Sequence, residues 1–275
     1  MATFDEEKIC KALPYAHIEV HSQIHSTNDR AIELIRQTAL NSPAVIIAES
    51  QTKGRGQRNR KWWSGAGSLT FSYVTSIPEK QTENQPIAPP GLISLASALA
   101  VSNALRSIEP TQKFEIKWPN DVMLDQSKIA GILVESVPAD TNRFMVIGIG
   151  ANINNSNMPA LHDMDDRRAS QEKTTATSLT QVSGKSASLS ETLIKILIEL
   201  KKQITIAIDS PQEIVDQFNQ VLMWRERAIL VNFPSGATLT GTCLGITSDG
   251  GLRVKTKDQV EIIHSGSLQK IDEAG

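Results

Sequence analysis

The sequence predicts an α+β fold, in which helices pack on a mixed, largely antiparallel sheet and a small β-barrel follows. Three observations lead to this prediction. Short strand-like segments between residues 114 and 153 are separated only by tight turns, as in antiparallel sheets. Longer segments at 92–108 and 189–224 carry apolar residues at helical spacing. From Arg227 onward, short alternating segments between Gly-containing turns are typical of a small barrel.

Length and composition are those of a soluble protein with two domains. The 275 residues suffice for one large and one small domain, which we place at residues 1–225 and 226–275. A net charge of -2 argues against a general nucleic-acid-binding protein, which is usually basic. Cys10 and Cys243 lie far apart, so we expect free thiols and a cytoplasmic protein. Polar residues interrupt the apolar segment 92–108, so no membrane span is expected.

The chain opens with a short polar lead-in, residues 1–17, for which we expect one helical turn. Alternating apolar and polar residues then predict a half-buried strand at 18–24. His17, His21 and His25 lie four residues apart, a spacing that on a helix would align metal ligands. Because the alternation is that of a strand, a solvated polar face is favoured, and we assign no metal ligands.

A helix is predicted to begin at Ser26, because Ser26 and Asp29 form a capping-box-like start and apolar residues follow at helical spacing as far as residue 39. Asn41-Ser42-Pro43 ends this helix, and residues 44–48 form a buried strand. The strand leads directly into a highly charged segment, so it gives that segment a rigid base.

Residues 49–64 contain five cationic side chains between Lys53 and Lys61, two glycines and a tryptophan pair. Glycines let the backbone wrap closely round a ligand, and arginines bind carboxylate or phosphate oxygens with two donors. This loop therefore predicts an anion site, and a solvated basic loop or a nucleic-acid patch remains the alternative from composition alone.

The rest of the chain alternates between strands, loops and helices. Pro-rich and polar stretches predict loops at 78–91 and 154–177. The predicted strands are 69–75, 114–118, 122–124, 129–135 and 144–153, and the predicted helices are 92–108, 189–208 and 211–224.

Four motifs in order resemble the signatures of biotin protein ligases. The basic loop, Gly54-Arg55-Gly56-Gln57-Arg58-Asn59-Arg60-Lys61-Trp62, resembles the family's Gly-Arg-Gly-Arg-x-Gly-Arg-x-Trp signature. Ser26-Thr27-Asn28 precedes it, and Lys117-Trp118-Pro119-Asn120-Asp121 and Lys128-Ile129-Ala130-Gly131-Ile132-Leu133-Val134-Glu135 follow. The four motifs span roughly residues 18 to 152, and their order is more specific than any one of them.

This resemblance implies an enzyme that activates biotin with ATP and Mg²⁺ to biotinyl-5'-AMP. The biotinyl group then passes to a lysine of a biotin carboxyl carrier protein, such as the acetyl-CoA carboxylase subunit or another biotin-dependent carboxylase carrier domain. The implied fold is that of biotin and lipoate ligases, distantly like the catalytic domain of class II aminoacyl-tRNA synthetases, with an SH3-like C-terminal domain. Residues 1–17 leave no room for a helix-turn-helix, so no DNA-binding repressor activity is expected. Monomer and homodimer both remain open.

The resemblance also implies roles for individual residues. Arg55, Lys117 and Lys128 are the candidate catalytic cations, and Asp121 is the candidate that orients the carrier lysine or accepts its proton. An Asx turn after Pro119 is the open alternative for Asp121. The candidate ligands of biotin or its adenylate are Ser26, Thr27, Asn28, Gln51, Gly54, Arg55, Gly56, Gln57, Trp62, Lys128 and Gly131, and those of the nucleotide are Arg58, Arg60, Asn120 and Asn152.

Two positions depart from the family signature. Gln57 stands where the family usually has arginine, and Asn59 where it usually has glycine. We therefore expect faster loss of the adenylate, while Asn59 tolerates a left-handed backbone better than most residues. A lipoate ligase on the same fold is the alternative enzyme, and a nucleic-acid-binding or regulatory protein is the alternative from another class.

Overall fold

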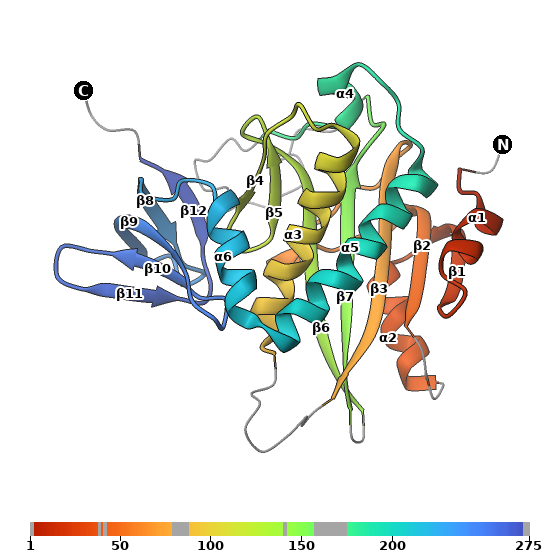
Figure 1. Ribbon diagram of the computed structural model, residues 1–275, viewed down its shortest axis with the longest axis horizontal. Helices are drawn as coiled ribbons and strands as arrows, with labels where there is room; N and C mark the ends of the chain where they lie inside the picture. The colour runs from red at the N-terminus through yellow and green to blue at the C-terminus, as the bar shows by residue number, and fades with distance from the viewer. Residues whose placement is uncertain are drawn as a thin grey trace.

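A seven-stranded sheet forms the centre of the protein, and a five-stranded sheet forms its C-terminal end (Figure 1). The computed structural model describes residues 3–37, 40, 43–78, 88–139, 142–156 and 175–271. The strand order in the large sheet is β1-β2-β3-β7-β6-β5-β4. Its strands are β1 (His17–Ile24), β2 (Ala44–Gln51), β3 (Ser68–Pro78), β4 (Phe114–Lys117), β5 (Asp121–Leu124), β6 (Ser127–Ala139) and β7 (Asn142–Asn152).

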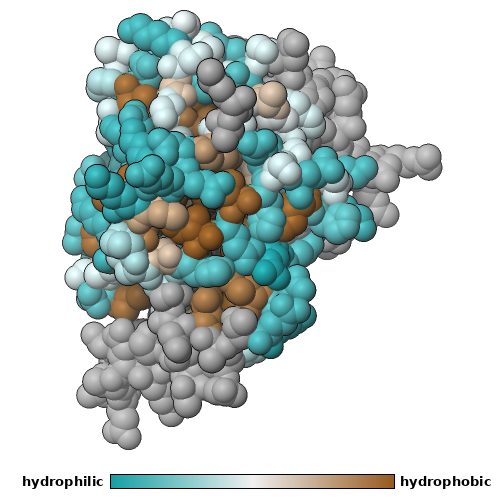
Figure 2. All heavy atoms as spheres, turned by 90° about the vertical axis from the view of Figure 1, so that its right-hand side faces the viewer, coloured by the Kyte–Doolittle hydropathy of each residue, from teal (hydrophilic) through white to brown (hydrophobic). Residues whose placement is uncertain are grey.

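Only β1 and β2 pair in parallel, and the other neighbours in the large sheet are antiparallel. The predicted mixed, largely antiparallel sheet is therefore confirmed. β1 is an edge strand, and its exposed side chains are mostly polar. The face nearest the N terminus is largely hydrophilic, with apolar side chains showing between the polar ones (Figure 2). Polar and charged residues on an edge strand disfavour pairing with other chains.

One face of the large sheet is covered by α3 (Pro90–Ile108) and α5 (Leu189–Asp209), with α6 (Pro211–Val221) beside them (Figure 1). Leu69 and Phe71 of β3 point into this layer and are fully buried. By length and composition alone, α3 could cross a membrane, but 72% of its 18-residue apolar stretch is buried inside the protein, as in a core helix.

The opposite face is covered in part by α2 (Thr27–Gln37). Ala31 and Leu34 of this helix pack against Ile46, Val74 and Val146 of three neighbouring strands. The predicted start is confirmed, because the Asp29 backbone N–H donates to Ser26 Oγ over 3.3 Å. Helix α2 packs mainly on β2, β3 and β7, so the half of this face formed by β6, β5 and β4 is left for other elements.

The C-terminal domain is an open antiparallel sheet of order β11-β10-β9-β8-β12, with β11 and β12 at its edges, rather than the closed barrel that the sequence predicted. It is held to the large sheet by Trp118, which is 1% exposed and whose indole N–H donates to the Gly250 carbonyl over 3.0 Å. The strands are β8 (Ala228–Asn232), β9 (Thr238–Ile246), β10 (Leu252–Lys255), β11 (Val260–Ile263) and β12 (Ser267–Lys270).

Some boundaries differ from the prediction. The helix expected at 211–224 ends at Val221, and Trp224 has a left-handed backbone with φ 63°. The short helix α4 (Leu179–Ser183) was not predicted, although Ser178 and Gln181 form a capping box. The lead-in contains α1 (Glu6–Ala12), as expected. The predicted loops at 78–91 and 154–177 lie largely outside the described residues, as do residues 41–42 of the predicted helix end.

Candidate functional site

The site lies on the half of the sheet face that α2 leaves uncovered, where small residues of several strands form a floor. Residues directly opposite one another in antiparallel strands point to the same face. A single row of paired residues therefore crosses this floor from β2 to β4. The row is Ala48, Thr70, Gly150, Gly131, Asp121 and Lys117.

A β-bulge brings Lys128 to the same floor. Gly131 pairs with Asp121, but the register shifts so that Lys128 pairs with Met123, and Ile129 is the extra residue. In a regular strand, residues three apart point to opposite faces. Because of the extra residue, Lys128 and Gly131 lie on one face, while Ile129 turns into the core at 0% exposure.

The Lys128 ammonium forms an ion pair with Asp121. Lys128 Nζ lies 2.5 Å from Asp121 Oδ1, and the two side chains are only 20% and 21% exposed. The backbone of Lys128 is also fixed, because its N–H donates to Thr175 and its carbonyl accepts from Thr177. The sequence predicted a functional Lys128 and Asp121, and the structure brings the two together.

Trp62 covers the glycine floor. A Cβ atom added at Gly150 would lie 2.1 Å from the indole Cε2, and one at Gly131 would lie 3.2 Å from Cζ3. Lys128 Nζ lies 5.7 Å from the centroid of the same ring, within reach of a cation–π interaction. Glycine is thus required at position 150 for the indole to lie against the strand.

The basic loop is a small hairpin that positions Trp62. The Trp62 N–H donates to the Gly54 carbonyl over 2.9 Å, and the Gly56 N–H donates to the Arg60 carbonyl over 2.7 Å. Between these bonds, the backbones of Arg55 and Lys61 form an antiparallel β-bridge. A Cβ atom at Gly54 would lie 2.5 Å from the Trp62 carbonyl oxygen, so only glycine fits there.

At the tip of the hairpin, residues Gln57–Asn59 form the short 3₁₀ turn η1. The left-handed residue of this turn is Arg58, with φ 59° and ψ 34°, rather than Asn59. Arg58 and Arg60 have exposed side chains, while Gln57 is half-buried. The nucleotide-binding roles of the two arginines remain predictions.

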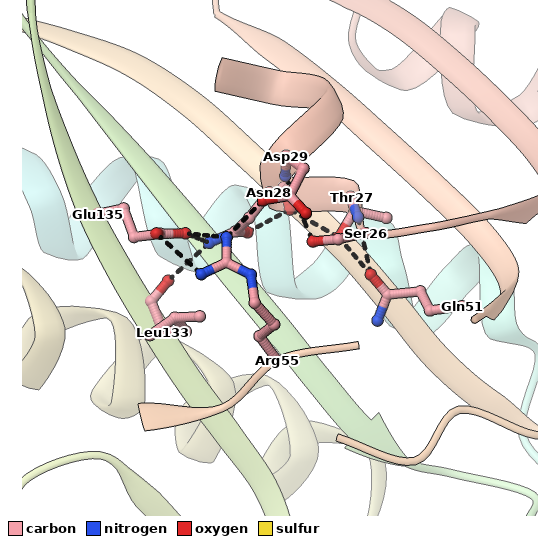
Figure 3. A network of polar contacts seen from close by, with 9 residues as sticks. Ser26, Thr27, Asn28, Asp29, Gln51, Arg55, Leu133 and Glu135 are labelled. Atoms are coloured by element: carbon pink, nitrogen blue, oxygen red, sulfur yellow. Dashed lines mark hydrogen bonds and ion pairs between the residues drawn. The ribbon is translucent and has the colours of Figure 1, made fainter. Parts of the chain in front are cut away.

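Arg55 points back from the hairpin to the start of α2 and to β6 (Figure 3). Its guanidinium donates to Asp29 Oδ1 over 2.5 Å and to both carboxylate oxygens of Glu135 over 3.2 Å. Burial lowers the pKa of Arg55, but these two carboxylates outweigh burial and raise it above its ordinary value. A ligand carboxylate or phosphate must compete with Asp29 and Glu135 for this arginine.

A chain of hydrogen bonds continues from Glu135 to Gln51 (Figure 3). Asn28 Nδ2 donates to Glu135 Oε2 over 2.7 Å, and Ser72 Oγ lies within bonding distance of both Asn28 Oδ1 and Thr27 Oγ1. Gln51 Oε1 accepts from the Thr27 N–H over 2.7 Å. The structure thus brings the Ser-Thr-Asn motif, Gln51 and Arg55 together, and their roles as ligands of biotin remain predictions.

Three predicted residues, Lys117, Asn120 and Asn152, are buried polar side chains. Lys117 is 6% exposed, and its ammonium lies 5.3 Å from the ring centroid of Trp224, in the connection to the C-terminal domain. Asn120 Nδ2 donates to the Ile132 carbonyl over 2.6 Å, and Asn152 is buried at the end of β7. Contacts of Asn120 or Asn152 with a nucleotide remain predictions.

Sequence reasoning gave Asp29 only a capping role and gave Ser72 and Glu135 none, although these three residues hold the network together. The alternation of Ser68, Thr70 and Ser72 with buried apolar residues was the available signal, because a central strand rarely carries three hydroxyl side chains on one face.

The histidines of β1 bind neighbouring side chains. His17 and His21 each lie within 3.2 Å of Glu19, whose carboxylate also receives two hydrogen bonds from Arg30. Hydrogen bonds from Arg30 are the largest influence on the pKa of Glu19 and, despite its burial, hold it at about 2. Within the described part of the chain, no group of three His, Cys, Asp or Glu side chains is placed to bind a metal ion.

Two family models match this chain. Residues 20–152 match the biotin/lipoate A/B protein ligase family, and residues 227–270 match the biotin protein ligase C-terminal domain. With the sheet, the glycine floor and the lysine described above, these matches define the class: the chain belongs to the biotin/lipoate A/B protein ligase family.

Individual relatives narrow this class. The biotin–[acetyl-CoA-carboxylase] ligase of Mycobacterium tuberculosis is 25% identical over 256 residues, which are 92% of this chain and 89% of that protein. The bifunctional ligase/repressor BirA of Bacillus subtilis is 28% identical over 260 residues, covering 92% and 74%. A structure of the Aquifex aeolicus biotin protein ligase with biotin and ATP is 26% identical, with a TM-score of 0.74 over 92% of this chain and 97% of that one. The protein is a biotin protein ligase, an ATP-dependent enzyme.

Proposed function

We propose that this enzyme forms biotinyl-5'-AMP on the glycine floor and transfers the biotinyl group to a lysine of a biotin carboxyl carrier protein. The observation that carries the proposal is the pairing of Lys128 with Asp121 directly beside Gly131, Gly150 and Trp62. Lys128 supplies a fixed ammonium group beside a glycine surface on which an acyl substrate can lie close to the strands.

In the first half-reaction, a biotin carboxylate oxygen attacks the α-phosphate of ATP, and pyrophosphate leaves. Both reactants are anionic, so preorganised cations lower the barrier. Lys128 neutralises the carboxylate and then the acyl-phosphate oxygen. The Arg55 guanidinium binds the same carboxylate or acyl-phosphate after it has released Asp29 or Glu135. Gln51 and the start of α2 hold the polar ring of biotin, and Arg58 and Arg60 bind the nucleotide.

In the second half-reaction, the amine of the carrier lysine attacks the acyl carbonyl, and AMP leaves. The attacking amine must be neutral and must lose a proton as the amide forms. Asp121 orients the amine or accepts that proton, and its distance of 2.5 Å from Lys128 keeps it close to the acyl-phosphate.

Magnesium enters this proposal as the counter-ion of the nucleotide. The carboxylates of the site, Asp29, Glu135 and Asp121, are already paired with Arg55 or Lys128. Mg²⁺ commonly binds phosphate oxygens and water with few protein ligands. When bound, it would neutralise charge on the phosphates.

The carrier is proposed to be the biotin carboxyl carrier domain of a biotin-dependent carboxylase, since the Mycobacterium tuberculosis relative is named for acetyl-CoA carboxylase. We do not propose DNA repression, because the net charge of -2 disfavours binding to a polyanion. We propose a cytoplasmic enzyme of two domains, residues 1–225 and 226–275, and leave its oligomeric state open.

The test is biotin-dependent exchange between ATP and pyrophosphate by the purified protein, run beside lipoate and octanoate. Exchange with biotin, lost in Lys128→Ala, is expected. Exchange with lipoate alone would keep the fold and overturn the substrate. Transfer is tested next with a carrier domain, where Asp121→Asn should slow amide formation more than exchange, and a salt-dependent gel shift tests DNA binding.

A further inference from the structure

We infer that Thr70 is a specificity-determining residue, whose hydroxyl hydrogen-bonds the ureido ring of biotin. This inference rests on the proposed function and adds a residue to the site that none of the motifs contains. It begins from an unusual property of this hydroxyl: Thr70 is 2% exposed, and its Oγ1 has no hydrogen-bond partner among the residues that the structure describes.

An unpaired buried hydroxyl destabilises a protein, and most buried polar side chains are paired. The neighbours of Thr70 on the same strand follow that rule. Ser68 Oγ accepts from Asn155 Nδ2 over 2.7 Å, and Ser72 Oγ contacts Thr27 and Asn28. Of the three buried hydroxyls that β3 presents to this face, Thr70, the middle one, is left for a ligand.

The direction of Thr70 follows from the strand register. Leu69 and Phe71 point into the helical layer, so Thr70 points to the opposite face. It is paired directly with Gly150, the glycine against which the Trp62 indole lies. Thr70 is therefore part of the floor itself.

A second unpaired polar atom lies at the same place. Trp62 Nε1 is buried without a partner in the described structure, and it lies 2.3 Å from where a Cβ of Gly150 would be. The indole thus covers the floor beside Thr70 without satisfying either group. A ligand that reaches Thr70 takes the place of the indole.

The position along the face indicates which part of biotin is bound. Thr70 lies between Lys128, which is proposed to hold the carboxylate end, and Ser72, which contacts the Thr27 that also binds Gln51. Biotin carries its hydrogen-bonding groups at these two ends, in the carboxylate and the ureido ring. Ser72, the next residue of β3 on the same face, is about 7 Å from Thr70. Thr70 is therefore close enough to contact the ureido ring that Gln51 is proposed to hold.

The test compares Thr70→Val, which keeps the shape and removes the hydroxyl, with Thr70→Ser, which keeps the hydroxyl. Ser102→Ala is a matched control, because Ser102 is also a buried, unpartnered hydroxyl but lies in α3 on the opposite face. Dissociation constants for biotin and desthiobiotin are measured by calorimetry, together with the melting temperature of each free protein.

We expect Thr70→Val to weaken biotin and desthiobiotin alike by about 10-fold or more, since a buried ureido group loses its partner. Thr70→Ser should stay within about 3-fold of wild type, and Ser102→Ala should bind as wild type does. Both Thr70→Val and Ser102→Ala should melt a few degrees higher, because each removes an unpaired buried hydroxyl.

Unchanged biotin affinity in Thr70→Val would overturn the inference and leave the proposed function intact. Weaker binding of biotin but not of desthiobiotin, which lacks the sulfur and keeps the urea, would overturn the assignment to the ureido ring. A wild-type protein that neither binds biotin nor catalyses exchange would overturn both.

Discussion

Replacing Gly150 by alanine tests the contact between the glycine floor and Trp62. The added Cβ would lie 2.1 Å from Cε2 and 2.3 Å from Cζ2 and Nε1, whereas ordinary contact begins at 3.4 Å. The ring would have to move by roughly 1 Å, and the hairpin bond from Trp62 to Gly54 resists that movement. Such overpacking lowers the free energy of unfolding by about 1–3 kcal/mol.

The reasoning is checked with a double-mutant cycle of Gly150→Ala and Trp62→Ala. Without the indole, alanine at 150 meets no ring and is expected to be neutral, or stabilising by up to about 1 kcal/mol, because glycine is unfavourable inside a strand. The four proteins are unfolded in urea and followed by circular dichroism. Gly56→Ala is the control, since its nearest contact would be an ordinary 3.6 Å. An equal loss from Gly150→Ala with and without Trp62 would refute the packing described here.

Three further predictions concern other parts of the chain. Gln57→Arg should slow dissociation of pre-formed biotinyl-5'-AMP several-fold in a filter-binding assay, because it restores a cation in the hairpin, and an unchanged rate would contradict the expected loose retention. Because Arg30 holds the pKa of Glu19 at about 2, below its ordinary 4.5, Glu19 stabilises the fold above pH 4.5 and loses this effect as the pH falls toward 2. Glu19→Gln should therefore lower the free energy of unfolding by about 1–2 kcal/mol at pH 7 and by less at pH 3.5, and an equal loss at both pH values would argue against it. Trp118→Phe leaves the Gly250 carbonyl unpaired and should destabilise the protein by about 1–3 kcal/mol, with faster amide exchange in the C-terminal sheet as the measurement and unchanged exchange as the contrary result.

Local patterns predicted most of the fold. Residues 18–24 alternate between apolar and polar side chains, and residues 44–48 are continuously apolar. Both patterns can be seen within a few residues, so both strands were predicted correctly. The short helix α4 was missed, because five residues give too little periodicity to separate a helix from a loop. Helix α6 ends at Val221, and Trp224 beyond its end lies against Lys117, a contact between distant parts of the sequence that no local pattern indicates.

The site was predicted by motif and not by geometry. The sequence indicated Arg55 and Lys128 as cations, but it did not indicate that Asp29 and Glu135 bind the first while Asp121 binds the second. The contacts of Arg55 join segments far apart in the sequence, and the contact of Lys128 with Asp121 depends on the bulge at Ile129, and no local pattern encodes either. Thr70 was missed for a related reason, since an unpaired hydroxyl is recognised only when its surroundings are known.

The bulge at Ile129 decides on which face of the sheet Lys128 lies. If the strand paired regularly through Ile129 at its present length, Lys128 would be three regular residues from Gly131 and would point to the opposite face, among the buried side chains under α3. Loss of the bulge by such a slip in register would abolish catalysis even with every functional side chain retained. A change of length at Asp125 or Gln126, in the turn before the strand, leaves the face of Lys128 unaltered. In engineered variants of this enzyme, the pairing register of the residues after Lys128 therefore matters as much as their identity.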